Sequence, residues 1–210
     1  MRKKRGLFLV LEGMDGAGTT TQSKQLVSTL RASGLEARQT HEPSGGEIGE
    51  WTRQLLKQKR ADMSPFSMAL LFAADRYDHV QREIVPLLES GIHVVCDRYM
   101  MSSLVYQQVT GVHRKFLLDL HQHALMPDWT FFLRVTPEEA ALRRERRGIP
   151  ADLYEAADFQ QKVSDLYERE CVLWSQQHGK ITQFDGQLQV EELTRCVLQG
   201  TEVLLEGSGG

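Results

Sequence analysis

The stretch GMDGAGTTT, residues 13–21, has the glycine spacing of a loop that binds phosphate groups. Gly13, Gly18 and Thr20 stand where the pattern G-x-x-x-x-G-K-[ST] requires them, but Thr19 occupies the lysine position. Glycines let backbone N–H groups curl around phosphate oxygens, and a helix that follows adds the positive end of its dipole. The alternative is a glycine-rich turn without a ligand. We predict a nucleotide-binding loop made of Gly13, Met14, Asp15, Gly16, Ala17, Gly18, Thr19, Thr20 and Thr21, with the Thr20 hydroxyl placed to meet Mg²⁺.

The stretch CDRYMMSSLVYQ, residues 96–107, joins an acid to an arginine at the end of an apolar run. Asp97 could hold a metal-bound water, and Arg98 could clamp phosphate oxygens. The alternative is a structural ion pair between the two side chains. Ser103, Tyr106 and Gln107 follow at near-helical spacing, so we expect them to share one face.

Three further groups could contribute to a phosphoryl-transfer site. Four arginines precede a Gly/Pro loop: Arg143, Arg144, Arg146 and Arg147. They could belong to a mobile lid at about 143–155, or they could form a solvated basic face. Phe72 and Arg76 lie four residues apart on a predicted helix, so they would face the same way. They could supply a ring that stacks on a base and a hydrogen-bond donor beside it, or they could be a core phenylalanine and a surface arginine. Arg53 follows the loop at 43–46, which could also be an ordinary polar turn.

Apolar runs of strand length alternate with helical patterns along the chain, which predicts an α/β fold with a parallel sheet. Strands are expected at 7–12, 36–41, 92–97, 129–135 and 180–184, and helices at 20–33, 65–89, 102–125 with a break near Gly111, 138–147, 156–178 and 191–205. We expect a P-loop NTPase-like three-layer fold, with about five parallel strands and helices on both faces. Ligands of such folds bind at the carboxyl ends of the strands, here after residues 12, 41, 97 and 135.

The totals describe an ordinary globular chain. Its 210 residues suit one compact domain, taken as 1–205 with a flexible tail at 206–210. The net charge of −3 argues against a strong general attraction to nucleic acid or anionic membranes. The three cysteines lack metal-site spacing and indicate free thiols in a reducing cytoplasm. No stretch has the length and apolarity of a signal peptide or a membrane span.

Five stretches, in this order, resemble the thymidylate (dTMP) kinase family: EGMDGAG, EPSGGEIGEWTRQLL, LLFAADR, CDRYMMSSLVYQ and VTPEEAALRR. The similarity runs from about residue 5 to residue 200. It implies the reaction ATP + dTMP → ADP + dTDP with Mg²⁺, by in-line transfer in which the protein positions groups and offsets charge. It also implies a homodimer formed through helices.

The resemblance also implies a role for each matching residue. Phe72 would stack on thymine, Arg76 would bond an exocyclic oxygen of the base, Ser103 and Gln107 would read its remaining polar edge, and Tyr106 would lie against the sugar. Asp15 and Glu42 match acids near the acceptor, Arg53 and Arg98 would hold the 5′-phosphate of dTMP beside Ser102, and Asp97 and Thr20 would support Mg²⁺.

Three departures from the family pattern remove positive charge. Thr19 replaces the loop lysine, His41 stands where an arginine is usual, and the lid motif reads Asp152-Leu-Tyr-Glu155 without its arginine. Residues 13–21 contain no arginine, so we hypothesise that one of the four arginines at 143–147 compensates. Two alternatives remain open: a nucleotide-binding protein without catalysis, and a kinase for another nucleoside monophosphate or a deoxynucleoside.

Overall fold

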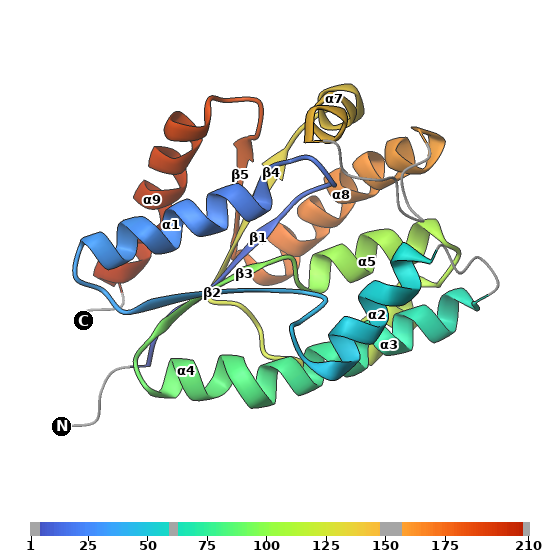
Figure 1. Cartoon of the computed structure of the whole chain (residues 1–210), viewed down its shortest axis with the longest axis horizontal. Helices are drawn as coiled ribbons and strands as arrows, with labels where there is room; N and C mark the ends of the chain where they lie inside the picture. Colours follow the sequence, from blue (N-terminus) through green and yellow to red (C-terminus); the bar gives the residue numbers. More distant parts are fainter. Residues whose placement is uncertain (1–4, 59–62, 148–156, 208–210) are drawn as a thin grey trace.

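The computed structural model describes residues 5–58, 63–147 and 157–207. The elements follow one another as β1 (Phe8–Glu12), α1 (Thr19–Ala32), β2 (Ala37–His41), α2 (Glu47–Lys57), α3 (Pro65–His79), the π-helix η1 (Val80–Ile84), α4 (Val85–Glu89), β3 (His93–Asp97), α5 (Met100–Val109), α6 (Arg114–His121), β4 (Trp129–Arg134), α7 (Pro137–Arg147), α8 (Ala157–His178), β5 (Ile181–Asp185) and α9 (Val190–Gly207). Strands and helices alternate as the apolar pattern predicts (Figure 1).

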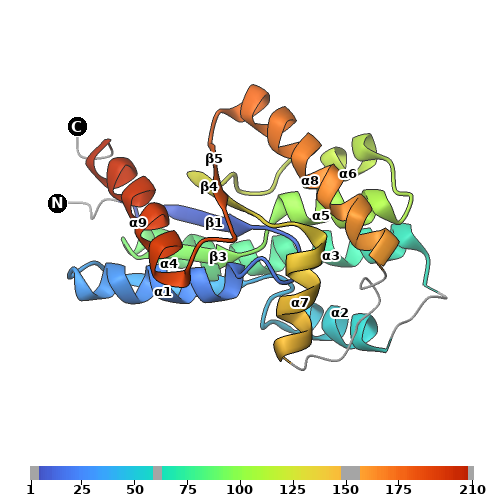
Figure 2. The ribbon, with the colours of Figure 1, turned by 90° about the horizontal axis from the view of Figure 1, so that it is seen from above.

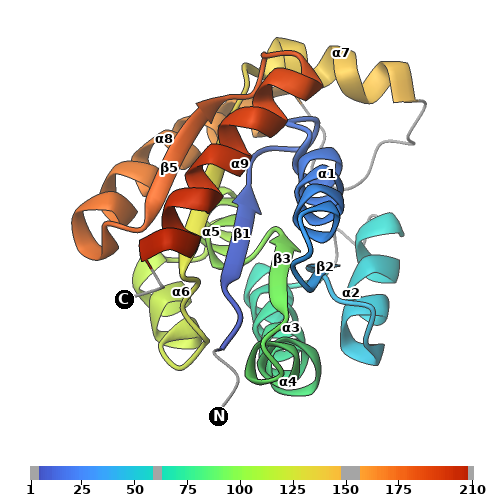
Figure 3. The same cartoon turned by 90° about the vertical axis from the view of Figure 1, so that its left-hand side faces the viewer.

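The five strands form one sheet in the order β2-β3-β1-β4-β5, and every pair is parallel. Helices α1 and α9 lie side by side on one face, while α5 and α8 pack together on the other (Figures 2 and 3). All five residues of β1 are buried, because the central strand of a sheet covered on both faces meets no water. The predicted three-layer α/β fold is therefore confirmed.

The predicted helix boundaries are largely confirmed, with two refinements. The expected helix at 65–89 is present, but it contains a π-helical turn at Val80–Ile84 between α3 and α4. The expected helix at 102–125 divides into α5 and α6, and Gly111 between them has a φ of +98°, which favours glycine. The break near Gly111 is thus confirmed.

The register of the sheet brings the functional strand ends together. Asp97 at the end of β3 lies opposite Leu11 of β1 and His41 of β2. On the other side of β1, Tyr167 of α8 is fully buried and stacks on Phe132 of β4, with ring centroids 5.2 Å apart. This stacking carries the tyrosine hydroxyl to the same edge of the sheet. In the described parts of the chain, no helix is both long and apolar enough to cross a membrane.

Candidate active site

The loop between β1 and α1 is shaped to receive an anion. Gly18 caps α1 with a φ of +93°, no side chain caps the helix, and its first turn contains no acid. The unpaired backbone N–H groups of that turn therefore point toward the loop, and the positive end of the helix dipole faces it. Thr19 is 5% exposed, and its Cγ2 lies 3.3 Å from the position that a Cβ on Gly13 would take. Thr19 thus packs inside the loop and contributes no charge.

Asp97 and Thr20 adjoin this loop in a geometry suited to a divalent cation. The Thr20 hydroxyl donates to Asp97 Oδ2 at 2.5 Å, whereas the buried Oδ1 has no partner among the described residues. Oxygen ligands of this kind suit Mg²⁺. The described residues hold no cluster of three or more His, Cys, Asp or Glu, so a bound ion would take further ligands from phosphate and water.

Arg98 forms an ion pair with Asp15 of the loop, at 2.6 Å between Nη2 and Oδ1. Its ion-pair partner is therefore Asp15, and not Asp97 as in the alternative of a structural Asp97–Arg98 pair. Tyr106 donates its hydroxyl proton to the other oxygen of Asp15 at 3.0 Å. Burial alone lowers the pKa of Arg98, but Tyr106 and Asp15 more than offset this and hold it well above its usual value. Arg98 has a φ of +70°, a conformation that non-glycine residues adopt mainly at functional sites. The guanidinium is therefore charged and fixed between loop and acceptor cavity.

Glu12, at the end of β1, is a site residue that the motifs did not identify. Its carboxylate accepts from the backbone N–H groups of Tyr99 and Ser102 at 2.8 and 3.1 Å, and from the hydroxyls of Ser102 and Tyr167 at 2.6 and 3.2 Å. Burial raises the pKa of Glu12 despite these donors. Ser102 also accepts from Arg98 at 3.2 Å, so Glu12 helps to position that arginine. An acid that ends an apolar strand was the signal for Asp97, and it could have found Glu12.

A cavity of about 280 Å³ opens beside Asp15 and Arg98. All ten residues that the sequence analysis assigned to the acceptor line it: Asp15, Glu42, Arg53, Phe72, Arg76, Arg98, Ser102, Ser103, Tyr106 and Gln107. They come from the phosphate loop, the ends of β2 and β3, and helices α2, α3 and α5, so segments far apart in the chain meet here (Figure 1). The cavity has the concave shape and mixed lining of a small-molecule site.

Gln107 is the least satisfied polar side chain of this cavity. It is 1% exposed, and neither its amide nitrogen nor its amide oxygen has a hydrogen-bond partner in the described part of the chain. Buried amide groups are rarely left unpaired, because desolvation without a partner costs about 1–3 kcal/mol. The amide therefore has a donor nitrogen and an acceptor oxygen available for the polar edge of a ligand.

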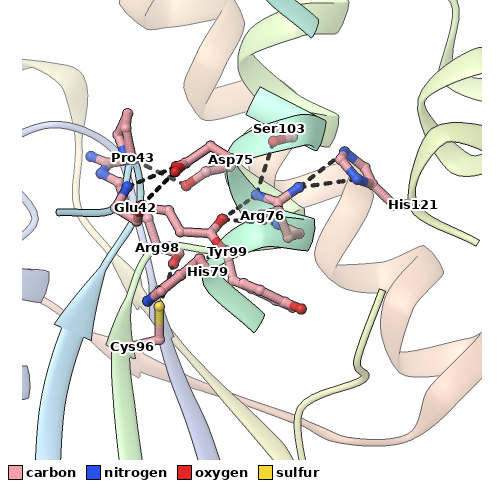
Figure 4. Close-up of polar contacts among 12 residues, drawn as sticks. Glu42, Pro43, Asp75, Arg76, His79, Cys96, Arg98, Tyr99, Ser103 and His121 are labelled. Atoms are coloured by element: carbon pink, nitrogen blue, oxygen red, sulfur yellow. Dashed lines mark hydrogen bonds and ion pairs between the residues drawn. The ribbon is translucent and has the colours of Figure 1, made fainter. Parts of the chain in front are cut away.

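Arg76 is a buried part of the cavity wall and does not lie at the outer surface of the protein. It is 1% exposed and donates to Glu42 Oε2 from Nε at 2.8 Å and from Nη2 at 2.6 Å. Figure 4 shows the Arg76 and Glu42 side chains facing each other. Nη2 also donates to Ser103 at 3.1 Å, and Nη1 donates to the His121 ring at 3.0 Å. Burial and the neighbouring Arg76 lower the pKa of His121 to about 2, so this imidazole is neutral and accepts. The alternative of a surface arginine at this position is wrong.

His79, which the sequence analysis did not assign, holds the other oxygen of Glu42. Its Nδ1 lies 3.2 Å from Glu42 Oε1, and its Nε2 lies 2.7 Å from the Thr40 hydroxyl and 3.5 Å from Glu83 (Figure 4). Burial lowers the pKa of His79, but the bonds to Glu42 and Glu83 outweigh it and raise the value to about 9. A protonated His79 thus fixes Glu42 together with Arg76. No sequence motif points to this histidine, because its partners lie on other elements.

The remaining predicted arginines differ in where they point. Arg53 donates to the carbonyls of Pro43 and Ser44 at 2.9 and 2.7 Å, on the wall of the cavity. Arg143 bonds Glu139 and the carbonyl of Gly186, whereas Arg144 donates to the carbonyl of Asp15 at 2.5 Å. Arg146 is exposed. The side chain of Arg147, and the predicted lid motif Asp152–Glu155, lie outside the described residues.

Comparisons with known proteins identify the family of this chain. A family model described as thymidylate kinase matches residues 11–196. A probable thymidylate kinase of Pyrococcus abyssi is 40% identical over 167 residues, covering 78% of this chain and 82% of that protein. A thymidylate kinase of Rhizorhabdus wittichii is 36% identical over 208 residues, covering 95% and 99%. The solved structure of a Candida albicans thymidylate kinase superposes with a TM-score of 0.80 at 24% identity, covering 95% and 92%, which supports the fold.

Proposed function

This chain belongs to the thymidylate kinase family and phosphorylates dTMP, and we propose that it does so with ATP as donor and with Mg²⁺ supported by Asp97 and Thr20. The observation that carries the residue assignment is the acceptor cavity. Its ten predicted lining residues lie beside a loop that has an uncapped helix end, and Asp15 belongs to both. Donor and acceptor sites therefore share one wall.

The reaction needs little covalent chemistry from the protein. An oxygen of the dTMP phosphate attacks the γ-phosphorus of ATP, the bond to the β,γ-bridging oxygen breaks, and its electron pair leaves with ADP. Arg98 and Arg53 hold the acceptor phosphate, and the N–H groups at the start of α1 hold the donor phosphates. Mg²⁺, when bound, neutralises charge on the phosphate oxygens. The catalytic contribution of these residues is alignment and charge compensation.

Base recognition follows from the unpaired amide of Gln107. A thymine edge offers an N–H between two carbonyl oxygens, which complements an amide that has one donor and one acceptor available. Phe72, half-buried on the cavity wall, supplies a ring for stacking. A neutral imidazole has one acceptor nitrogen, so His121 occupies one N–H of Arg76 Nη1. We assign the second N–H of Nη1 to an exocyclic oxygen of the base.

The sugar is assigned to Tyr106 and Asp15, whose hydrogen bond closes the cavity on the side of the phosphate loop. Glu42 contributes through its ion pair with Arg76, which fixes the wall behind the nucleoside. Tyr106 lies against the space for the 2′ position and discriminates against a ribose. These assignments rest on the lining of the cavity together with the family resemblance.

We also propose a cytoplasmic homodimer. Helices α2 and α3 pack against each other and carry exposed apolar side chains, with Trp51 52%, Phe66 42% and Leu70 50% exposed. We infer that a second copy of this chain covers these side chains, because exposed large apolar groups on a protein surface mark interaction sites. Sedimentation analysis of the wild type and of Leu70→Glu tests this, with a dimer expected for the former and a monomer for the latter.

The test of the enzymatic proposal is ADP release from Mg·ATP with dTMP, dUMP, dCMP and dAMP as separate acceptors. We expect turnover that prefers dTMP. The missing loop lysine favours one competing function, a protein that binds dTMP without phosphorylating it. Binding of dTMP by calorimetry without ADP release would support that competitor, and turnover with another acceptor would reassign the substrate.

A further inference from the structure

We infer that Arg144 of α7 takes the place of the missing loop lysine and carries its charge to the γ-phosphate of the donor. This inference rests on the proposed kinase reaction. It selects one residue among the three arginines of α7 whose side chains the structure describes, Arg143, Arg144 and Arg146. It also predicts that the positive charge missing from the phosphate loop is supplied by a helix that begins over one hundred residues later in the chain.

The phosphate loop, which is the proposed site of the donor phosphates, contains no cationic residue. Residues 13–21 contain neither lysine nor arginine, and Thr19 is packed inside the loop. Arg98 is the nearby cation on the acceptor side, but Asp15 and Ser102 engage its guanidinium. Charge that develops on the transferring phosphoryl group therefore needs a second source of compensation.

Helix α7 is seated directly against the phosphate loop. A Cβ placed on Gly16, which has a φ of +99°, would lie 2.5 Å from the carbonyl oxygen of Ala140 and 3.0 Å from its Cα. Ala140 is fully buried at this contact. The two backbones can approach this closely only because Gly16 has no side chain. The first turns of α7 are consequently fixed relative to the loop.

Arg144 lies one helical turn beyond Ala140, on the same side of α7. It is half-buried, and its Nη1 donates to the carbonyl oxygen of Asp15 at 2.5 Å, midway along the loop. A neutral carbonyl is a weaker partner for a guanidinium than a phosphate anion. A donor phosphate in the loop would therefore draw the guanidinium away from this carbonyl with only a small displacement.

The other described arginines of α7 are directed elsewhere. Arg143 is held by Glu139 at 2.6 Å and by the carbonyl of Gly186 at 2.8 Å, which turns it toward the segment after β5. Arg146 is exposed to solvent. Among the side chains that the structure describes on α7, Arg144 is the arginine that bonds the phosphate loop. The experiment below also tests Arg147, whose side chain lies outside the described residues.

The experiment is a mutant cycle between positions 144 and 19, followed by ADP release and by calorimetric dTMP binding. Arg144→Ala should lower kcat about 10²–10³-fold, the effect expected for one charged donor at the transition state, and leave dTMP affinity within about twofold. Thr19→Lys in the Arg144→Ala background should recover at least about tenfold of that loss, because a lysine at position 19 starts inside the loop. Glu145→Ala, an exposed neighbour on the same helix, is the matched control and should stay within about twofold of the wild type.

Three results would overturn the inference while leaving the kinase intact: wild-type turnover in Arg144→Ala, a loss that Thr19→Lys fails to restore, or a loss confined to Arg147→Ala. Arg144→Lys keeps the charge and guards against a folding defect in the alanine variant, and its kcat should fall between those of the wild type and Arg144→Ala. Absence of ADP release in the wild type would instead refute the proposed reaction itself.

Discussion

Replacing Gly16 with alanine tests whether the seat of α7 on the phosphate loop controls the reaction. Gly16 and Gly111 have nearly identical φ angles, of +99° and +98°. A Cβ on Gly111 meets nothing within 4 Å, whereas one on Gly16 lies 2.5 Å from the Ala140 carbonyl oxygen. Gly111→Ala therefore measures the cost of the left-handed conformation alone, and Gly16→Ala adds the collision.

The two costs can be separated in magnitude. An alanine in the left-handed region costs about 1–2 kcal/mol, which is all that Gly111→Ala should lose in free energy of unfolding. Overpacking against the Ala140 backbone adds roughly 1–3 kcal/mol at Gly16. To reach an ordinary 3.4 Å contact, α7 or the loop must move by about 0.9 Å, and a displacement of about 1 Å can cost on the order of 10² in rate.

The assay is thermal unfolding and ADP release for both variants, at a temperature where both remain folded. We expect Gly111→Ala to keep kcat within about twofold, and Gly16→Ala to lose about 100-fold in kcat and more in Tm than Gly111→Ala, at about 2–4 °C per kcal/mol for a chain of this size. Equal Tm and equal kcat in the two variants would refute the reasoning, since the contact with Ala140 would then have no energetic consequence.

Three further predictions concern the acceptor and metal sites. Gln107→Leu should raise KM for dTMP roughly 10–100-fold with KM for ATP unchanged in steady-state kinetics, because the base edge loses its partners at about 1–3 kcal/mol. Asp97→Asn should raise the Mg²⁺ concentration for half-maximal activity about 10–100-fold in a metal titration, and an unchanged titration would remove Asp97 from the metal site. His79 has a raised pKa of about 9 in the folded state, so the stability that it contributes is fully present below the unfolded value near 6.5 and is lost as pH rises through about 9. His79→Asn removes the charge that faces Glu42 and Glu83, so the pH dependence of the free energy of unfolding should weaken above pH 7 in this variant.

Much of the fold could be predicted because its signals are local. The apolar strands β1 and β3 stand out as buried runs, and Gly111 marks the break between α5 and α6. The π-helical turn at Val80–Ile84 could not be predicted, since the helical pattern continues through it. Its register depends on how His79 and Glu83 meet the end of β2, which is a long-range contact.

The candidate site divides in the same way. Asp97 and Gln107 were named from motifs and line or adjoin the cavity, because residue type and spacing carry their signal. No motif points to Glu12, His79 or His121, since their roles depend on partners 37 to 155 residues away in the chain. The sequence alone does not distinguish an Arg76 that binds the base from an Arg76 exposed at the surface. The structure buries the Arg76 side chain against Glu42.

The sequence by itself determined that this chain forms a parallel α/β sheet with a phosphate loop after its first strand, and that the loop lacks its lysine. The period of the hydrophobic pattern, the glycine spacing and the residue identities are local properties, because each is contained within one short segment of the chain. Only the tertiary structure decided which arginine reaches the loop, because the close backbone contact between Gly16 and Ala140 sets the rotation of α7 and sends Arg144, not Arg143, to Asp15. The four arginines at 143–147 are equivalent in sequence, and packing distinguishes the three whose side chains the structure describes.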